Sequence, residues 1–391
     1  MKFLRISLIA LLAIAFVVGS TGCKTAATPT PAPTPAPTPA PTPAPTPAPV
    51  VKKLKVAFVY VGPHNDGGYS QAHEDGRLYL QQNDPNVDTT YAESIPEGSQ
   101  AEKTFRDYAS AGYKLIFGTS FGFMEPMVNA AKDNPTVKFM HASGYKRSDN
   151  LGTYFGRMEQ PDYLSGLVAG KMTKTNKIGF VLPFSIPECI REVDSFTVGL
   201  REVNPQATVT VVYTNSWFDP ATEGSAAKSL LNQNCDIIVS GVDSPAPLDE
   251  AFKAGKYGIG YDMDMAAGMK TPEEAKSVLT SRIWHWGPYY LKVAKAVEDG
   301  TWTSGDYWGG MADGIVDIAP ISAAVPQDVI DYVNTRKQLI IDGKYTPFDG
   351  PMINQKGETV VPAGTTMSDG DQLNLQWFVQ GVIGDIPKSG S

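Results

Sequence analysis

A regular alternation of strand and helix patterns, beginning at Leu54, constrains the fold of this chain more than any other feature. Short apolar runs of strand length alternate with segments whose apolar residues recur at helical spacing. The predicted strands of the first half are Leu54–Val61, Val87–Glu93, Lys114–Gly118, Val137–His141 and Gly152–Arg157. The helices predicted between them are Gly68–Gln82, Ser99–Ala111 and Met124–Asn134. Such alternation predicts a parallel sheet with helices on both faces.

The same alternation starts again after Gln160. A helix is predicted over Pro161–Met172, and strands follow at Lys177–Leu182, Ala207–Thr214, Asp236–Ser240 and Tyr257–Tyr261. Further helices are predicted near Val193–Val203, Pro220–Gln233 and Leu248–Ala254. The chain is therefore predicted to be an α/β protein with two Rossmann-like lobes. Loops at the carboxyl edges of the two sheets should face a cleft, where a small ligand is expected.

The N-terminal segment has the three parts of an export signal. Lys2 and Arg5 precede an apolar core, and small residues lead to Cys23. This pattern resembles a bacterial lipoprotein signal, so residues 1–22 are predicted to be removed and Cys23 to be lipidated. Ser20 stands where that pattern usually has a leucine, so an ordinary secreted protein stays the alternative.

Residues 23–51 contain the predicted lipidation site and then a low-complexity spacer. The spacer repeats Pro-Ala-Pro-Thr, which favours extended polyproline II conformation and cannot bury a core. At about 3.1 Å per residue, some 25 residues would reach on the order of 80 Å. The sequence thus predicts an extracytoplasmic domain held at the membrane by a lipid anchor and a stiff linker.

Composition excludes several classes of function. The formal net charge of −8 argues against nucleic acid as a partner, because phosphate binding requires a basic face. The sequence has four histidines, and their spacing does not match a metal site: His64, His73, His141 and His285. Neither a metal site nor a cofactor is therefore predicted. Cys189 and Cys235 could form a disulfide or remain free thiols, and their spacing leaves both open.

The loop after the first strand, Gly62–Gly68, is the first candidate for ligand contact. Asp66 could accept hydrogen bonds from a ligand, and Tyr69 could lie flat against a planar ligand. The alternative is structural: Asp66 would cap the following helix and Tyr69 would fill the core. The residues of this loop leave both interpretations open.

Polar or aromatic loops also follow the strands of the second lobe: Asn215–Pro220, Gly241–Pro245 and Asp262–Asp264. Trp217 and Tyr69 occupy equivalent edge positions in the two lobes, so we predict that they face each other as an aromatic clamp. The alternative is a structural tryptophan packed under a helix. Asp243 and Asp262 supply carboxylates at the same edge.

A Gly-x-Ser-x-Gly pattern around Ser120 raises the possibility of a serine hydrolase. Its serine would need His141 or His285 as base, with an orienting acid from Asp243, Asp262 or Asp264. Only two predicted strands precede it, which is early for a nucleophile elbow. We therefore favour a non-enzymatic role, with Ser120, Phe121 and Phe123 in another loop of the cleft.

These loops together resemble the BMP family (basic membrane protein, PnrA-like or Med), whose members are substrate-binding lipoproteins of ABC importers for purine nucleosides and related compounds. Asp66–Gln71 resembles the family's D-x-S-F-N-Q loop, in which the aspartate contacts the base and the aromatic residue stacks on it. Ser216–Asp219 resembles its S-F-x-D loop, which implies a second stacking role for Trp217. Gly260–Asp264 resembles its G-x-D-x-D strand end, so Asp262 would be the aspartate that holds ribose hydroxyls.

The resemblance implies a type I periplasmic binding protein fold with a three-crossover hinge. Lobe 1 would comprise residues 52–158 and 283–310, and lobe 2 residues 159–282 and 311–391. The crossovers are expected near Phe155–Gln160, Thr280–Ile283 and Gly309–Val316. It also implies that the lobes close around a ligand and that an ABC permease in the membrane recognises the closed form.

Two departures from the family pattern favour a free base over a nucleoside. Gly241–Pro245 replaces a glycine-rich loop, and Trp284 replaces a lysine that faces the sugar. An apolar ring at Trp284 would fill the ribose space, so a free base is favoured over a nucleoside. The loops that contain Ser120, Trp217 and Asp243 resemble the branch of the family associated with adenine-like bases. A sugar, amino-acid or amide ligand, or a ligand-sensing receptor domain, is the alternative function.

Overall fold

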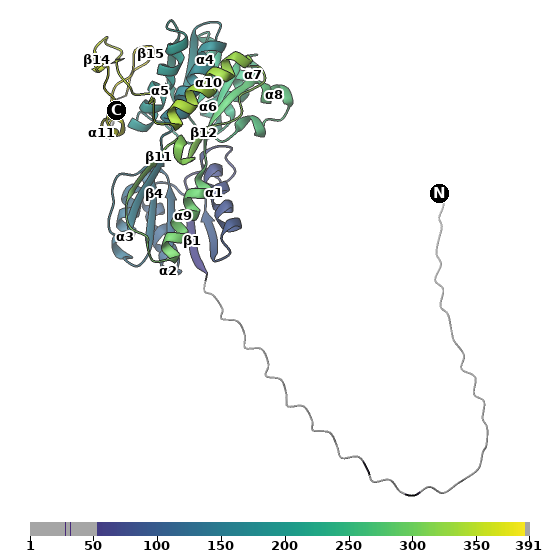
Figure 1. Ribbon diagram of the computed structural model, residues 1–391, viewed down its shortest axis with the longest axis vertical. Coiled ribbons are helices and arrows are strands. Elements are labelled where there is room, and N and C mark those ends of the chain that lie inside the picture. The colour runs from purple at the N-terminus through teal and green to yellow at the C-terminus, as the bar shows by residue number, and fades with distance from the viewer. Residues whose placement is uncertain (1–27, 29–31, 33–52, 388–391) are drawn as a thin grey trace, which may run out of the picture. The chain divides into compact units, whose positions relative to one another are not determined.

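The computed structural model describes Thr28, Ala32 and residues 53–387. The predicted signal segment 1–22, the predicted lipidation site Cys23 and the other linker positions up to 51 lie outside the described residues. The described chain from residue 53 onward belongs to one compact unit, Val51–Ser391. Figure 1 shows that this unit consists of two α/β lobes.

The first sheet has six parallel strands in the order β11-β5-β4-β3-β1-β2. They are β1 (Leu54–Tyr60), β2 (Val87–Ala92), β3 (Leu115–Thr119), β4 (Lys138–Ala142), β5 (Leu151–Gly156) and β11 (Asp306–Gly309). The flanking helices are α1 (Tyr69–Asn83), α2 (Ser99–Ser110), α3 (Met124–Asp133) and α9 (Trp286–Glu298). Alternate strand residues point to opposite faces, so Val56 and Phe58 pack against α1 and α9, while Ala57 and Val59 pack against α2 and α3.

The second sheet has seven strands in the order β12-β10-β9-β8-β6-β7-β15, and all pairs are parallel except β12 with β10. They are β6 (Lys177–Leu182), β7 (Thr208–Tyr213), β8 (Ile237–Ser240), β9 (Tyr257–Asp262), β10 (Val278–Trp284), β12 (Val316–Ile318) and β15 (Val382–Ile383). The helices are α4 (Glu159–Met172), α5 (Pro187–Val203), α6 (Pro220–Asn232), α7 (Ala246–Lys253), α8 (Pro272–Ser277) and α10 (Gln327–Ile341). The architecture confirms the predicted α/β class with two parallel sheets.

Close packing of α4 on α5 depends on residues without side chains. A Cβ on Gly166 would collide with the carbonyl oxygen of Phe196, and a Cβ on Gly199 would collide with that of Tyr163. The two helices therefore approach at backbone distance beneath the second sheet. Between Leu182 and α5 the chain forms a short loop at the carboxyl edge of this sheet.

The last part of the described chain packs on the second lobe. It comprises the hairpin of β13 (Met352–Ile353) and β14 (Thr359–Val361), the short helix α11 (Asp369–Leu373), and β15, which pairs with β7. Short 3₁₀ turns occur at η1 (Phe121–Phe123), η2 (Met265–Gly268) and η3 (Met311–Asp313).

The chain passes between the sheets at three places: from β5 to α4, from β10 to α9, and from β11 to β12. The second passage comes later than expected from the sequence. β10 continues to Trp284, which pairs with Val316 of β12, so Ile283 and Trp284 lie in the second sheet and not in lobe 1. Strand β10 continues to Trp284 because β12 supplies pairing partners up to that residue.

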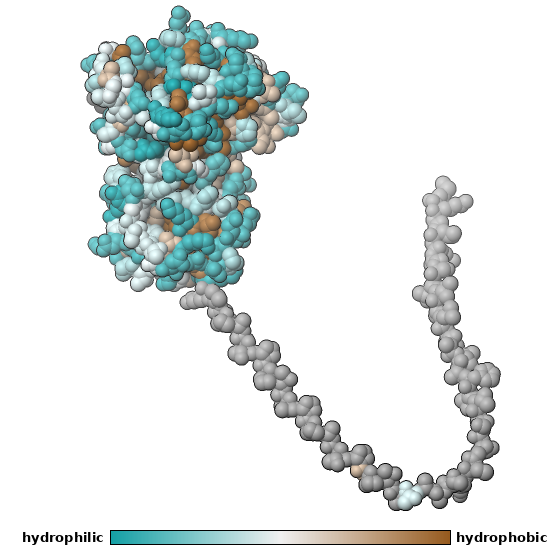
Figure 2. Space-filling view, in the orientation of Figure 1, coloured by the Kyte–Doolittle hydropathy of each residue, from teal (hydrophilic) through white to brown (hydrophobic). Residues whose placement is uncertain are grey.

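The surface is largely polar. Figure 2 shows hydrophilic residues over most of the visible face, with smaller apolar areas between them. Within residues 28, 32 and 53–387, no helix combines the length and apolar character needed to cross a bilayer.

Cys189 and Cys235 are buried free thiols. Cys189 belongs to the core that contains α4 and α5, whereas Cys235 packs with α6 and α7 on the other face of the second sheet. The sheet separates the two sulfur atoms. Of the two alternatives that the sequence left open, a disulfide and free thiols, the structure therefore has free thiols.

Candidate ligand-binding site

A small cavity of about 10 Å³ lies between the two lobes, where loops from the carboxyl ends of both sheets meet. Its lining residues come from both lobes: Val61, Tyr69, Ser120, Phe121, Ser143, Glu188, Trp217, Asp243 and Tyr261. The sequence predicted Tyr69, Ser120, Phe121, Trp217 and Asp243. Asp66, Asp262 and Trp284, which were also predicted, are absent from the lining. The structure adds Val61, Ser143, Glu188 and Tyr261, which sequence reasoning missed.

Two aromatic residues bring flat rings to the cavity from opposite lobes. Tyr69 is the first residue of α1, and its ring meets the His73 ring edge-on, with centroids 4.4 Å apart. Trp217, in the loop between β7 and α6, meets the Phe184 ring edge-on at 5.2 Å. These neighbours hold both rings in place at the wall of the cavity.

Asp66 caps helix α1. Its Oδ1 accepts hydrogen bonds from the N–H groups of Gly68 (2.8 Å) and Gln71 (3.0 Å), and its Oδ2 accepts from Ser70 N–H (2.9 Å). Burial raises the pKa of the Asp66 carboxyl, and the three N–H donors oppose that rise. Asp66 therefore has the capping role that the sequence offered as one alternative, and it shapes the loop that carries Tyr69. Its contact with a ligand stays a prediction.

The capped loop of lobe 1 touches the facing loop of lobe 2. Gly67 has a φ of +87°, a conformation that glycine adopts without strain, and it faces the Pro245 ring. A Cβ on Gly68 would overlap the carbonyl oxygen of Asp243. Backbone therefore meets backbone where the two lobes close over the cavity.

Asp243 brings an unsatisfied carboxyl group to the cavity. The side chain is 2% exposed, and among the described residues its Oδ2 has no hydrogen-bond partner. Its backbone N–H donates to the carbonyl oxygen of Trp217 at 3.1 Å, which fixes the two lining residues together. Burial, reinforced by the Asp262 and Asp66 carboxyls, raises the pKa of Asp243 well above its usual range. A ligand N–H or O–H would satisfy this group.

Asp262 and Trp284 form a fixed pair behind the lining. The indole Nε1–H of Trp284 donates to Asp262 Oδ1 at 2.9 Å, and the Trp284 ring stacks on Trp286 with centroids 4.6 Å apart and planes 16° apart. Asp262 is fully buried and adopts a φ of +68°. Burial raises its pKa well above the usual range, and the indole N–H opposes that rise. One carboxylate oxygen is therefore already used by the tryptophan.

A buried ion pair supports the strand ends under the site. Arg282 Nε lies 3.0 Å from Asp162 Oδ1, and both side chains are fully buried. Arg282 Nη2 donates to the carbonyl oxygen of Ser240 at 2.6 Å, and the guanidinium lies 4.6 Å from the centroid of the Tyr261 ring. Burial raises the pKa of Asp162, and the Arg282 charge opposes that rise. Arg282 thus connects α4, β8, β9 and β10 below the cavity.

Glu188 is the main lining residue that the sequence analysis missed. Helix α5 begins at Pro187, earlier than the predicted start at Val193, and this places Glu188 in its first turn at the carboxyl edge of the sheet. A proline followed by an acidic residue is a typical helix start, so this signal could have found it. Burial, together with the nearby Glu192 carboxyl, raises the pKa of Glu188 to about 8.

The geometry at Ser120 does not support a hydrolase. The Ser120 hydroxyl donates to Glu97 Oε1 at 2.5 Å. His141 Nε2 lies 2.8 Å from the carbonyl oxygen of Ser120 and so cannot serve the hydroxyl as a base. His285 is exposed at the N-terminal end of α9.

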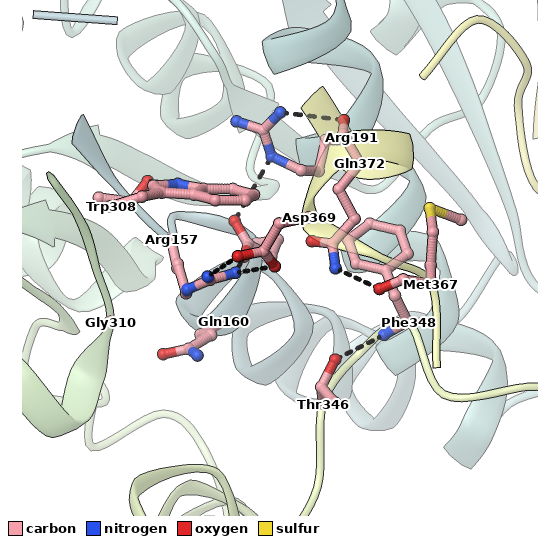
Figure 3. Close-up of polar contacts among 12 residues, drawn as sticks. Arg157, Gln160, Arg191, Trp308, Gly310, Thr346, Phe348, Met367, Asp369 and Gln372 are labelled. Atoms are coloured by element: carbon pink, nitrogen blue, oxygen red, sulfur yellow. Dashed lines mark hydrogen bonds and ion pairs between the residues drawn. The ribbon is translucent and has the colours of Figure 1, made fainter. Parts of the chain in front are cut away.

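Residues of the crossovers form a second cluster beside the cavity (Figure 3). Arg157 donates to both carboxylate oxygens of Asp369, at 3.0 and 2.6 Å, and its guanidinium lies 4.0 Å from the centroid of the Trp308 ring. Gln160 Oε1 accepts from the N–H of Met311 at 2.7 Å. Helix α11 is thereby attached to the first crossover, and Gln160 joins the first crossover to the third.

A groove of about 660 Å³ adjoins this cluster. It shares Phe121, Ser143 and Glu188 with the cavity, so the two spaces have common walls. Within residues 53–387, no group of His, Cys, Asp and Glu side chains is arranged to hold a metal ion.

The fold and the site first define a class. The protein has two α/β lobes joined by three crossovers, and aromatic and carboxyl side chains line the cavity between them. This is the architecture of solute-binding proteins. Residues 53–346 match the family described as ABC transporter substrate-binding protein PnrA-like. The chain is also 39% identical over 338 residues to a purine-binding protein of Brucella abortus, covering 86% of this chain and 95% of that one.

A second curated relative agrees with this class, and a solved structure agrees with the fold. A Haloferax volcanii protein described as a candidate ABC transporter glucose-binding protein is 34% identical over 334 residues, covering 85% of this chain and 81% of that one. The solved structure of an ABC transporter solute-binding protein from Conexibacter woesei superposes with a TM-score of 0.62 at 22% identity, covering 75% of this chain and 98% of that one. This structural likeness concerns the fold alone.

The chain belongs to the PnrA-like (Bmp) family of ABC transporter substrate-binding proteins. It is a solute-binding protein and not an enzyme, and its family membership implies an extracytoplasmic location. The family and the type I periplasmic binding protein fold predicted from the sequence are confirmed.

Proposed function

We propose that this protein binds a purine base, with an adenine-type base preferred to its nucleoside, and presents it to an ABC permease. The observation that carries the proposal is that Tyr69 and Trp217 line the cavity from opposite lobes beside the buried Asp243, whose Oδ2 lacks a partner among the described residues. The cavity has a volume of about 10 Å³, so the lobes must separate to admit a base. A purine offers flat faces for the two rings and an edge with N–H groups for the carboxyl. The similarity to the Brucella abortus purine-binding protein supports the same ligand class.

The preference for a base over a nucleoside rests on Trp284. Its ring is buried, stacks on Trp286, and its N–H occupies Asp262 Oδ1. Asp262 is the residue to which the family resemblance gives ribose binding. With one of its oxygens already bonded to an indole, Asp262 has less capacity to hold two hydroxyl groups.

Closure of the lobes is the proposed mechanism. A base that contacts Tyr69 on lobe 1 and both Trp217 and Asp243 on lobe 2 binds the closed form better than the open form. The crossovers would act as the hinge, and the permease would recognise the closed protein.

Isothermal titration of the purified protein with adenine, hypoxanthine, guanine, adenosine, guanosine and glucose tests the proposal. We expect heat and saturable binding with a base and weaker binding with its nucleoside. Equal or tighter binding of the nucleosides would contradict the argument from Trp284. Failure to bind any purine would reject the proposed ligand class.

A sugar is the second candidate ligand. The similarity to the Haloferax volcanii protein favours it, and tryptophan and tyrosine rings also stack on sugar faces. Binding of glucose in the titration without any purine would support this candidate instead.

Replacement of Trp217 by alanine should weaken adenine binding about 10- to 100-fold, because stacking on one aromatic ring contributes about 1–3 kcal/mol. Titration calorimetry measures the change. Trp302→Ala is the matched control, since this half-buried tryptophan lies over Lys138 in lobe 1 and does not line the cavity. Unchanged affinity in Trp217→Ala would contradict the aromatic clamp.

Lipid anchoring through Cys23 belongs to the same proposal and is supported by the signal pattern of the N-terminal sequence. When the full chain is expressed in bacteria, it should be recovered in the membrane fraction, and Cys23→Ser should shift it to the soluble fraction. Equal membrane recovery of both forms would contradict lipidation at this cysteine.

A further inference from the structure

Glu188 stands out among the polar groups of the cavity because nothing in the described chain engages its carboxyl group. Two other polar lining residues are already bonded: Ser120 donates to Glu97, and Tyr261 Oη donates to Glu192 Oε1 at 2.7 Å. No hydrogen bond or ion pair within residues 53–387 involves the Glu188 side chain, which borders both the cavity and the adjoining groove. Like Asp243, it is free to contact a ligand.

The surroundings of Glu188 disfavour a negative charge. The titratable and charged groups around Glu188 lie on α5, on α1, in the loop that follows β8, on β9 and along the groove. They are Arg191, Glu192, Tyr69, Asp243, Tyr261, Arg157, Asp306 and Asp369. Arg191 lowers the pKa of Glu188, but burial and Glu192 outweigh it and raise that pKa to about 8. Glu188 is half-buried in the structure, and its raised pKa favours the protonated, uncharged form near neutral pH.

We propose that Glu188 recognises the edge of the bound base through a pair of hydrogen bonds, in addition to Asp243. A carboxylic acid has an O–H donor and a C=O acceptor on neighbouring atoms. The edge of adenine has a ring nitrogen acceptor beside an N–H donor, so the two groups can form a pair of hydrogen bonds. A carboxylate has only acceptors and can make one of these two bonds. This inference rests on the proposed purine ligand and adds the residue that reads its edge.

The proposal predicts how binding depends on pH. Below about pH 8, Glu188 already carries its proton, so binding requires no proton uptake. Above that pH the free protein loses the proton and must take it up again to bind, so the dissociation constant should rise by up to about tenfold per pH unit. Affinity is thus retained at lower pH and lost as the pH rises.

Two substitutions separate the roles of shape, hydrogen bonding and charge. Glu188→Gln keeps one donor group and one acceptor in nearly the same shape but cannot titrate, whereas Glu188→Ala removes both. The matched control is Glu273→Gln, because Glu273 also follows an N-terminal proline, in the first turn of α8, but is exposed and away from the cavity.

Titration calorimetry with adenine should be carried out from about pH 6 to about pH 9 on the four proteins. We expect Glu188→Ala to bind about 10- to 100-fold more weakly at neutral pH. Glu188→Gln should stay within about threefold of wild type and should lose the fall in affinity above pH 8. Glu273→Gln should follow the wild type throughout. Thermal unfolding without ligand confirms that each variant is folded.

The possible results separate this inference from the proposed function. If wild type binds adenine and Glu188→Ala binds it equally well, Glu188 has no recognition role and the inference alone fails. If Glu188→Gln is as weak as Glu188→Ala, or keeps the wild-type pH dependence, the uncharged pairing is wrong. If wild type binds no purine at any pH, the proposed function fails and the inference fails with it.

Discussion

Replacement of Gly68 by alanine is expected to weaken adenine binding by about 10- to 100-fold, equivalent to about 1.4–2.8 kcal/mol, without unfolding either lobe. The added Cβ would overlap the carbonyl oxygen of Asp243 in the facing lobe. Backbone cannot turn away as a flexible side chain can, so the lobes must stay further apart. Tyr69 follows Gly68 directly, and Asp243 lines the other side of the same cavity. A small separation therefore affects contacts from both lobes at once.

Calorimetry and small-angle scattering check this prediction together. Wild type should become more compact when adenine is added, whereas Gly68→Ala should change less at the same saturation. Gly268→Ala is the control, because its added Cβ would meet open space on the exposed η2 turn. Wild-type affinity and compaction in Gly68→Ala would show that the contact between the loops is not needed for binding.

Replacement of Arg282 by alanine is expected to lower the free energy of unfolding by about 3–5 kcal/mol, the usual cost of breaking a buried ion pair. Arg282 and Asp162 have no exposed surface, so water cannot replace the lost partner. The substitution also removes the donor to the Ser240 carbonyl oxygen and the guanidinium that packs on Tyr261. Chemical denaturation monitored by circular dichroism measures the loss.

The pH dependence of this loss has a definite sign. Removal of the Arg282 charge should raise the folded-state pKa of Asp162 further, because that charge opposes the effect of burial. An acid with a raised folded pKa stabilises the fold at low pH and loses this contribution as the pH rises. Arg282→Ala should therefore regain part of its lost stability as the pH falls.

Two comparison variants test the explanation. The double variant Asp162→Leu/Arg282→Met should be more stable than Arg282→Ala, because apolar side chains of similar size need no charged partner. Arg106→Ala should have a much smaller effect, since Arg106 pairs with Glu102 and Asp133 at the surface. An equal loss in Arg106→Ala and Arg282→Ala would contradict the role of burial.

The sequence predicted several residues that line the cavity, and the roles of these residues stay predictions. Tyr69, Trp217 and Asp243 were predicted from their loops and do line the cavity, because residues after parallel strands must emerge at the carboxyl edge. Glu188 was missed because α5 starts earlier than its apolar spacing indicated. Sequence patterns find the ends of elements only approximately, and a shift of a few residues decides which side chain reaches a cavity.

The sequence by itself determined the alternation of strands and helices and the two lobes, because burial periodicity and turn residues act over short stretches of chain. The family followed from the resemblance of its loop motifs to those of known members. Only the tertiary structure decided the partner of each buried polar group. Asp66 accepts from the helix that follows it, whereas Asp262 accepts from Trp284 on the neighbouring strand. Which of these partners a carboxylate finds depends on how strands and lobes pack. A buried carboxyl group accepts hydrogen bonds from the donors that packing brings nearest to it. The order of residues along the chain does not specify which donors these are.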